Sequence, residues 1–526
     1  MLVSRRNVLR GAAALSLLPL AARGASPADL DVAVVGGGAS GAYTAWRLRN
    51  ANPNLRVRLF ELSGRIGGRL HSVSFPQAPH LVGEVGGMRF LEAQRHVFPL
   101  VKKLGLPMRG YPVNDPEDRV AMRGKSFMNK DAGIPPNLVP YTIPAADQSP
   151  SSDLFMRATE RVVPDARKMT RARWLRIRSH VHYKGRLLKD WAAWALFADL
   201  LTHEEMEYLV DTIGYDDVFL HQTALEAFDF TFLADDESKP FFTIPDGYQR
   251  LPQTLASEAN RLGADVAMRT QLASLVVPDS AGGDFTLGFT DADGRLSTLT
   301  ASRVVLAMPR HSIELIENFP ALKEPRFAAL IASVNPIAAC KALLLYPKPW
   351  WKDLGIEGGR SVTDMPARQF YALGAENERL PAEPANGYGV LMMYCDAFNV
   401  EYWKELVDPA AVGAAGFQWL DGNSQLASEV HREASLVYGT TPPAPVAACF
   451  QDWTANPFGG AWHNWAKGAD SLALADRVMK PLADRHLYIC GEAYGTHSPG
   501  WVEGALERAE TMLQTHFALP RAQWLG

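Results

Sequence analysis

Residues 31–48 read DVAVVGGGASGAYTAWRL and decide the fold of the first part of the chain. The opening run, residues 31–35, is rich in β-branched residues, which is typical of a buried parallel strand. A glycine-rich turn follows, and residues 42–48 then have the apolar spacing of a helix. A second apolar run, residues 56–60, ends at Glu61. This order predicts a βαβ unit of about 30 residues, the smallest half of a dinucleotide-binding α/β fold.

The turn has the spacing Gly36-x-Gly38-x-x-Gly41, in which each glycine has its own mechanical purpose. Gly36 permits a tight turn, Gly38 lets the backbone approach a pyrophosphate, and Gly41 lets the helix pack closely on the strand. Ala39 and Ser40 lie at the predicted helix start, where the N-terminus of the helix stabilises phosphate charge.

Glu61 lies twenty residues past Gly41, where a carboxylate can accept both hydroxyls of an adenosine ribose. The sequence therefore predicts dinucleotide binding, and the alternative is a glycine-rich turn without a ligand. The βαβ unit alone does not distinguish NAD from FAD.

Length and composition limit the classes of protein that this chain can belong to. Its 526 residues predict about three domain-sized units. The composition is 47% hydrophobic, with 13 Trp, 15 Tyr and 23 Phe, which excludes disorder as the main character of the chain. The 53 Lys and Arg residues nearly balance the 57 Asp and Glu residues, which argues against nucleic acid or an anionic membrane as a partner.

The N-terminal 25 residues have the pattern of a twin-arginine signal peptide. Arg5 and Arg6 stand before an apolar run, residues 11–22, which is about half as long as a membrane-spanning helix must be. The pattern predicts no membrane span and an exported protein, periplasmic or secreted. A short positively charged helix start is the alternative.

The remaining charged and sulfur-containing residues predict no further site. The four cysteines (Cys340, Cys395, Cys449 and Cys490) have no metal-binding spacing, and we expect buried thiols without a disulfide framework and no metal. The basic cluster between Arg167 and Arg178 is interpreted as a solvated helix face.

Later segments alternate between helical and strand patterns. Residues 154–232 have mainly helical spacing, and residues 119–122 and 126–128 form a predicted hairpin around Gly124. Further strands are predicted over residues 265–277, 284–290, 303–307, 340–346, 389–395 and 487–490, and a helix over residues 503–517.

Four segments resemble the flavin-containing amine oxidase superfamily. They are Glu61-Leu-Ser-Gly-Arg-Ile-Gly-Gly-Arg69, Gly247-Tyr-Gln-Arg-Leu-Pro-Gln-Thr-Leu255 with Arg303-Val-Val-Leu-Ala-Met-Pro309, Cys490-Gly-Glu-Ala493, and Gly500-Trp-Val-Glu-Gly-Ala505. The resemblance implies an α/β fold: a Rossmann-like, glutathione-reductase-type FAD-binding domain, a mixed-sheet substrate domain and a helical insertion. Physically, Arg65 and Arg69 can neutralise a buried diphosphate.

The same resemblance implies a division of the chain. The expected FAD-binding domain is discontinuous and comprises residues 29–105, 241–312 and 471–526. A helical insertion that roofs the pocket is expected over residues 106–240, and a substrate-binding domain over residues 313–470.

The resemblance also implies which residues hold FAD. In the family, the glutamate that matches Glu492, after Gly491, contacts the ribityl chain, and the helix start that matches Trp501 and Val502 faces the flavin. Leu272 takes the position of the adenine-contacting residue, which is usually Val, so its contact would be through the backbone. No cysteine matches the position that carries a covalent flavin, so FAD is expected to bind noncovalently.

Finer motifs resemble the L-amino acid oxidase branch. Gly86-Gly-Met-Arg89 resembles the segment whose arginine holds the substrate α-carboxylate, and the resemblance also implies that Gly87, Met88 and Arg89 contact the cofactor. Gly359-Arg-Ser-Val-Thr-Asp-Met-Pro-Ala-Arg-Gln-Phe-Tyr371 resembles the segment whose tyrosine assists that arginine. Lys341 matches the lysine that holds a water near flavin N5, and Trp501 would form a wall of the substrate slot.

The implied reaction transfers a hydride from the Cα of an L-amino acid to the flavin, and O2 then restores the flavin with release of H2O2. The imino acid hydrolyses to a 2-oxo acid and ammonia. Three alternatives stay open: an amino-acid 2-monooxygenase that yields an amide, a quinone-linked amino acid or amine dehydrogenase, and a flavin-free binding protein of the same fold. The sequence leaves a homodimer open.

Three polar residues of the C-terminal half and the roof have ambiguous environments. His463 could line the site or satisfy a structural contact. Asp216 and Asp217 would favour cationic substrate side chains if they pointed inward, but the pattern favours a surface position for both.

Overall fold

The computed structural model describes residues 28–113, 115–131, 140–144, 151–233, 239–375, 387–408 and 414–525. The predicted signal peptide, residues 1–25, lies outside these ranges. Within them, no helix combines the length and the apolar character that a bilayer-crossing segment requires.

The predicted βαβ unit forms the centre of a seven-stranded sheet. Strand β1 (Leu30–Val35) is parallel to β2 (Val57–Phe60) on one side and to β15 (Leu296–Leu306) on the other. The remaining strands are β12 (Asp265–Ala267), β13 (Thr270–Val276), β14 (Phe285–Asp291) and β24 (Leu487–Ile489). The strands expected here are confirmed, and the one expected over residues 265–277 is divided at Arg269, which has a φ of 52°. The sheet therefore combines segments from three separate parts of the chain.

Three helices pack beside β1 and build the core of this region. They are α1 (Ala39–Ala51), α9 (Arg250–Arg261) and α15 (Val502–Phe517). Their apolar faces meet the buried side chains of Val32 and Val34 from β1. The helical spacing seen after residue 502 is thus confirmed, and α15 brings the end of the chain against its beginning.

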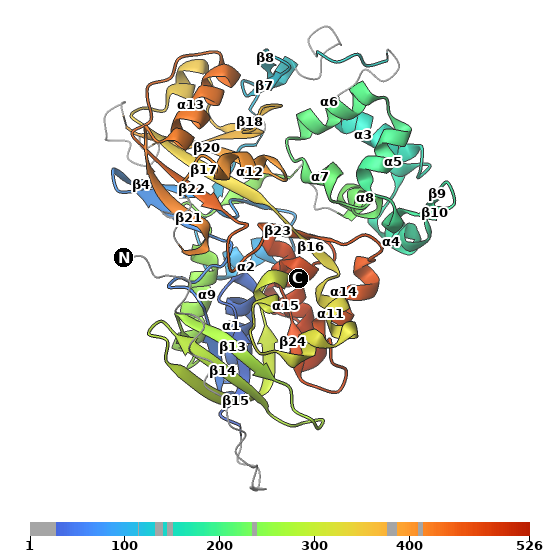
Figure 1. Cartoon of the computed structure of the whole chain (residues 1–526), viewed down its shortest axis with the longest axis vertical. Coiled ribbons are helices and arrows are strands. Elements are labelled where there is room, and N and C mark those ends of the chain that lie inside the picture. Colours follow the sequence, from blue (N-terminus) through green and yellow to red (C-terminus); the bar gives the residue numbers. More distant parts are fainter. Residues whose placement is uncertain are drawn as a thin grey trace.

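The second large sheet has eight strands and lies beside the first region (Figure 1). At its centre, β17 (Ala339–Tyr346) pairs with β20 (Gly389–Asp396), and every residue of β17 is buried. The other strands are β21 (Phe417–Asp421), β22 (Ala447–Asp452), β19 (Gln369–Ala375), β18 (Gly359–Thr363), β7 (Arg119–Met122) and β8 (Lys125–Met128). The predicted hairpin is therefore confirmed as β7 and β8, which join this sheet through β18. Helices α12 (Asn399–Lys404) and α13 (Gln425–Tyr438) pack on it.

A group of helices forms the third region, to the right of the second sheet in Figure 1. It contains α3 (Ser151–Glu160), α4 (Arg171–Ile177), α5 (Ala193–Leu200), α6 (His203–Ile213), α7 (Asp217–Leu220) and α8 (Ala224–Leu233), with the short hairpin β9 (His182–Tyr183) and β10 (Arg186–Leu187). The solvated interpretation of the basic cluster is wrong at Arg178, which is 1% exposed. Its guanidinium pairs with Asp229 and with Asp470, which are distant in sequence.

Shorter elements connect the three regions. They are β3 (Ser72–Phe75), β4 (Ala78–Glu84), β5 (Phe90–Leu91), β6 (Arg109–Gly110), β11 (Phe241–Thr243), β16 (Val334–Ile337), β23 (Trp462–Trp465), α2 (Val97–Lys103), α10 (Arg310–Glu314), α11 (Pro325–Ile331) and α14 (Ser471–Met479).

The four cysteines are all buried thiols, as expected. Two of them meet, because Cys340 of β17 stands directly opposite Cys395 of β20, with 3.3 Å between the Sγ atoms.

A buried ion pair ties α15 to α1. Arg47 donates from Nε and Nη2 to the carboxylate of Glu510 at 3.0 and 2.9 Å, and the Tyr43 hydroxyl donates to the same carboxylate at 2.7 Å. Arg47 and Glu510 are 4% and 1% exposed. Removing one member of such a pair leaves the other charge buried without a partner.

We therefore expect Glu510→Ala to lower the free energy of unfolding by about 3–5 kcal/mol, measured by denaturant titration. Glu258→Ala is the control, because Glu258 pairs with Arg261 in an exposed contact of α9. Equal stability of the two variants would contradict the structural importance of the Arg47–Glu510 pair.

Candidate active site

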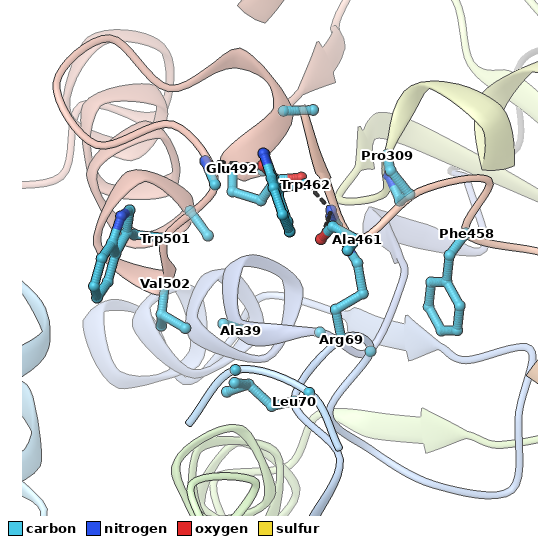
Figure 2. A pocket seen from close by; sticks show the side chains of 18 of the residues that line it. Ala39, Arg69, Leu70, Pro309, Phe458, Ala461, Trp462, Glu492, Trp501 and Val502 are labelled. Carbon is cyan, nitrogen blue, oxygen red and sulfur yellow. Dashed lines mark hydrogen bonds and ion pairs between the residues drawn. The ribbon is translucent and has the colours of Figure 1, made fainter. Parts of the chain in front are cut away.

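A single cavity of about 1190 Å³ connects the first sheet, the second sheet and the helical region. Its wall includes the glycine-rich turn (residues 36–40) and residues 67–70, 86–89, 491–493 and 496–502. The predicted site segments thus meet in one place although they come from both ends of the chain. Figure 2 shows Ala39, Arg69, Glu492, Trp501 and Val502 around this cavity.

The glycines of the turn differ in the reason why a side chain is excluded at each position. Gly36 has a φ of 108°, and a Cβ there would collide with the carbonyl of Ala307. A Cβ at Gly41 would collide with the carbonyl of Gly36. At Gly38, φ is −77° and the nearest heavy atom to such a Cβ, the Cα of Gly68, is 4.0 Å away. Protein packing therefore explains Gly36 and Gly41, and the empty space in front of Gly38 is left for a ligand.

The start of α1 provides donors for an anion. Gly38 precedes the helix, and no side chain caps its first backbone N–H groups. Such uncapped donors at a helix N-terminus bind phosphate well. Arg65 lies on the cavity wall and donates to the carbonyls of Gly68 and Leu70 at 2.7 and 3.0 Å, so it also holds the second turn in place.

Glu61 and Leu272 line the cavity beyond this turn. One carboxylate oxygen of Glu61, Oε2, accepts the Gly37 N–H at 2.7 Å, and the other accepts the N–H and the hydroxyl of Ser63 at 2.8 and 2.7 Å. These bonds fix the carboxylate, and Oε2, which accepts a single bond, keeps acceptor capacity for a ligand hydroxyl. Such an arrangement fits a ribose diol.

Glu492 is the centre of a second group of polar contacts on the cavity wall, which we call, together with the glycine-rich turn and Glu61, the cradle. Its carboxylate pairs with Arg69, contacts Nδ1 of His463 at 2.9 Å and accepts the Gly500 N–H at 3.1 Å. Burial opposes ionisation, but the positive charge of Arg69 and the contact with His463 outweigh it and lower the pKa of Glu492 to about 2. Arg69 also donates to the Ala461 carbonyl at 3.1 Å, as Figure 2 shows.

Gly491 allows this geometry because its φ is 146°, a value that side chains disfavour. His463 is fully buried and has the structural contact with Glu492 rather than a position on the cavity wall.

Arg89 stands in an aromatic box at the substrate end. The carbon of its guanidinium lies 4.8, 5.6 and 5.9 Å from the ring centres of Phe241, Tyr371 and Tyr111. Its Nη1 donates to the Tyr371 hydroxyl at 3.3 Å. No carboxylate within the described ranges pairs with it, and its Nε is buried without a partner. The cation is therefore positioned but not neutralised.

Tyr371 is completely buried behind Arg89 and is not part of the cavity wall. Its hydroxyl donates to Oε1 of Gln369 at 3.0 Å and lies 3.3 Å from the Tyr215 hydroxyl. Tyr371 therefore orients the Arg89 guanidinium in this structure.

Lys341 projects from β17 into the cavity wall next to Met88. Its Nζ donates to the carbonyls of Gly86 and Glu84 at 2.6 and 3.4 Å and lies 4.7 Å from the ring centre of Tyr394. Burial lowers the pKa of Lys341 to about 7, against the opposing effect of the Glu84 carboxylate, and the nearby charge of Arg89 acts in the same direction as burial. The ammonium is thus poised to lose its proton near neutral pH.

Trp501, at the start of α15, is also part of the cavity wall. Its ring is nearly parallel to that of Phe241, with 6.4 Å between the ring centres. Phe241, Tyr111 and Tyr215 were not predicted, because no motif or spacing marks them as partners of Arg89. The only local feature of the sequence near Tyr215 was the Asp216-Asp217 pair that follows it.

The surface position expected for Asp216 and Asp217 is wrong, since they are 2% and 1% exposed. Away from the cavity, Arg368 neutralises Asp216 in an ion pair, and the Asn399 amide donates a hydrogen bond to it. Asp217 lines the cavity, where its carboxylate accepts hydrogen bonds from Trp462 and Asn464. Their burial depends on partners that are remote in sequence.

Comparisons with known proteins agree with this geometry. The family model described as flavin containing amine oxidoreductase matches residues 39–511. Aplysianin-A of Aplysia kurodai is 26% identical over 93% of this chain and 90% of its own length. An L-amino-acid oxidase of Demansia vestigiata is 25% identical over 90% of this chain and 84% of its own length. A structure of putrescine oxidase bound to putrescine has a TM-score of 0.69 and 18% identity, covering 93% of this chain and 99% of that one.

The residues of the cradle fit the FAD that the sequence predicts. Uncapped helix donors face the expected diphosphate position, Glu61 faces the expected ribose, and Gly38 leaves space that no protein atom fills. Gly36, Ala39, Ser40, Arg69, Gly491 and Glu492 belong to the same continuous wall. Gly41 supports it from behind.

We expect Gly38→Ala to fold with unchanged thermal stability in the cofactor-free state but to bind FAD about tenfold or more weakly, because its methyl group takes up ligand space. Flavin content per chain and a titration of the apoprotein with FAD measure this. Gly41→Ala is the comparison, because its methyl group meets the Gly36 carbonyl and should destabilise the apoprotein itself. Full FAD affinity in Gly38→Ala would contradict the placement of the diphosphate.

Proposed function

The chain belongs to the flavin containing amine oxidoreductase family, and from that premise we propose that it oxidises L-amino acids to 2-oxo acids with release of ammonia and H2O2. Family membership makes it a flavin-dependent enzyme that acts on small molecules with O2. The finer assignment, an amino acid rather than a simple amine, depends mainly on one observation: Arg89 lies on the cavity wall, and no carboxylate among the residues that the structure describes pairs with it.

A carboxylate from the substrate would complete the surroundings of Arg89. Burying an unpaired cation is costly, and a bidentate arginine–carboxylate contact is the strongest common way to compensate it. An amino acid carries that carboxylate, whereas a simple primary amine does not. Tyr371 and the rings of Phe241 and Tyr111 restrict the guanidinium, so the substrate would be oriented as it binds.

The bound flavin would supply the electron-accepting chemistry, and the side chains of this chain would bind, orient and exclude water. Trp501 and Phe241 would form the apolar side of the slot. We also propose that FAD binds noncovalently, because no cysteine contributes to the described cavity wall.

The test is a panel of L-amino acids assayed for H2O2 and ammonia, with mass analysis of the products. A 2-oxo acid supports the proposal, whereas an amide would assign the enzyme to the monooxygenases. Reduction of a quinone without H2O2 would assign it to the dehydrogenases. D-amino acids and the decarboxylated amines serve as controls.

Arg89→Ala is expected to lower kcat/KM for L-amino acids, because a charge-assisted pair with the substrate is lost. The decrease should correspond to a loss of about 2–5 kcal/mol of transition-state stabilisation. The kcat/KM for the corresponding amines, which lack the carboxylate, should not decrease. Arg89→Lys keeps the charge but not the two parallel donors, and should recover part of the loss. Unchanged amino-acid kinetics in Arg89→Ala would refute the substrate assignment and leave the flavin assignment intact.

Lys341 should give the reaction with O2 a pH dependence. A cation favours the negative charge that develops as O2 is reduced. With a pKa near 7, Lys341 is charged below that pH and neutral above it, so reoxidation should slow as the pH rises through about 7. Stopped-flow reoxidation of the reduced enzyme measures this.

Lys341→Met should remove that pH dependence, whereas Lys348→Met, at an exposed position, should keep it. An identical pH profile in Lys341→Met would show that another group titrates.

A further inference from the structure

We propose that Arg360 is a second carboxylate-binding group in the cavity and that the enzyme prefers L-amino acids with an acidic side chain. This inference rests on the proposed function and specifies the substrate class of the same site.

Arg360 reaches the cavity from the second sheet. It stands on β18 directly opposite Tyr371 on β19, so the two side chains lie on the same face of the sheet. Its side chain is part of the cavity wall, and its guanidinium carbon lies 5.9 Å from the ring centre of Tyr215. The same tyrosine pair, Tyr215 and Tyr371, therefore separates Arg360 from Arg89.

Three consecutive contacts connect the two arginines. Nη1 of Arg89 lies 3.3 Å from the Tyr371 hydroxyl, which lies 3.0 Å from Oε1 of Gln369. That oxygen lies 3.4 Å from Nη1 of Arg360. The two guanidinium groups are thus close enough for one small dicarboxylate to reach both.

Some N–H donors of the Arg360 guanidinium are available to a ligand. Its Nη1 donates to the Ile213 carbonyl at 3.2 Å and to Gln369, both of which are neutral. Across the part of the chain that the structure describes, no carboxylate side chain forms an ion pair with it, and no bond engages its Nε or Nη2. Two unneutralised cations in one cavity oppose each other, and a ligand with two carboxylates would neutralise both.

The cavity also has carboxylates, which would favour a basic side chain if they were free. They are not. Asp229 pairs with Arg178 and accepts from Trp174, and Asp217 accepts from Asn464 and Trp462 and lies 3.2 Å from Nδ1 of His221.

Glu226 lines the cavity near Asp217 and Asp229 in sequence, and its environment differs from theirs. One of its oxygens accepts the Trp465 N–H at 2.6 Å, and the other is buried without a hydrogen-bond partner. Burial raises the pKa of Glu226 well above its usual range, so the charged form that would attract a basic side chain is disfavoured.

Asp217 and Asp229 are bonded within the protein and burial disfavours the charged form of Glu226, whereas no carboxylate side chain among the described residues pairs with Arg89 or Arg360. The other carboxylates of the wall are Glu61 and Glu492, which are bonded within the protein, and the exposed Glu317. The charged groups of the cavity wall that remain available therefore favour a substrate with an anionic side chain.

The first experiment compares substrates that differ only in charge. In the holoenzyme, kcat/KM for L-glutamate over L-glutamine, and for L-aspartate over L-asparagine, should exceed about ten, as expected for one added charge-assisted contact. Arg360→Gln should lower these ratios at least about tenfold, and Arg360→Lys should restore part of them. The exposed control Arg295→Gln should not change them.

The second experiment measures binding without turnover. Titration of the oxidised holoenzyme with glutarate, followed by the flavin absorbance spectrum, should give a Kd at least about tenfold lower than titration with glutaramate, in which one carboxylate is an amide. Arg360→Gln should remove that difference. Arg89→Ala should weaken both ligands.

The outcomes separate the two proposals. Equal rates with glutamate and glutamine, or ratios that Arg360→Gln leaves intact, would overturn the assignment of Arg360 while the amino-acid oxidase function stands. A preference for L-lysine that is lost in Asp217→Asn would overturn it in favour of a cationic side chain. If no amino acid is oxidised, the proposed function fails, and the glutarate titration still decides whether Arg360 binds a carboxylate.

Discussion

The partly buried ion pair between Arg69 and Glu492 is the contact on which the cavity wall depends. Arg69 follows the second glycine turn near the start of the chain, and Glu492 follows the last strand of the first sheet. The pair also engages His463 and the backbone of Ala461 and Gly500. Because a buried charge must be neutralised where it stands, this one pair fixes the relative positions of four segments that form the cavity wall.

The charges of the cavity are divided between its two ends. At the cofactor end, Glu61 and Glu492 are fixed by donors from the protein, and the uncapped start of α1 is free to bind an anion. At the substrate end, Arg89 is ordered by aromatic rings rather than by acids. Aromatic rings can order a cation without neutralising it, which keeps its affinity for an incoming carboxylate.

The sequence predicted those parts of the structure that depend on local pattern. The glycine spacing, the strand β1 and the closing helix α15 are confirmed, because steric limits on glycine and hydrophobic periodicity act over a few residues. The positions of Asp217 and Arg178 were wrong, because charged residues are usually exposed and their compensating partners lie far along the chain. Phe241 and Tyr215 were missed for the same reason: only the folded chain brings them to Arg89.

The interleaved connectivity of the first sheet has a consequence for biosynthesis. The phosphate-binding turn emerges early, but Glu492 is more than 400 residues away from it. At a translation rate of roughly 5–20 residues per second, the turn waits on the order of 20 to 90 seconds for that side chain. The cavity wall is therefore incomplete on any nascent chain that ends before Glu492, so stable binding of the proposed FAD would follow the synthesis of that residue.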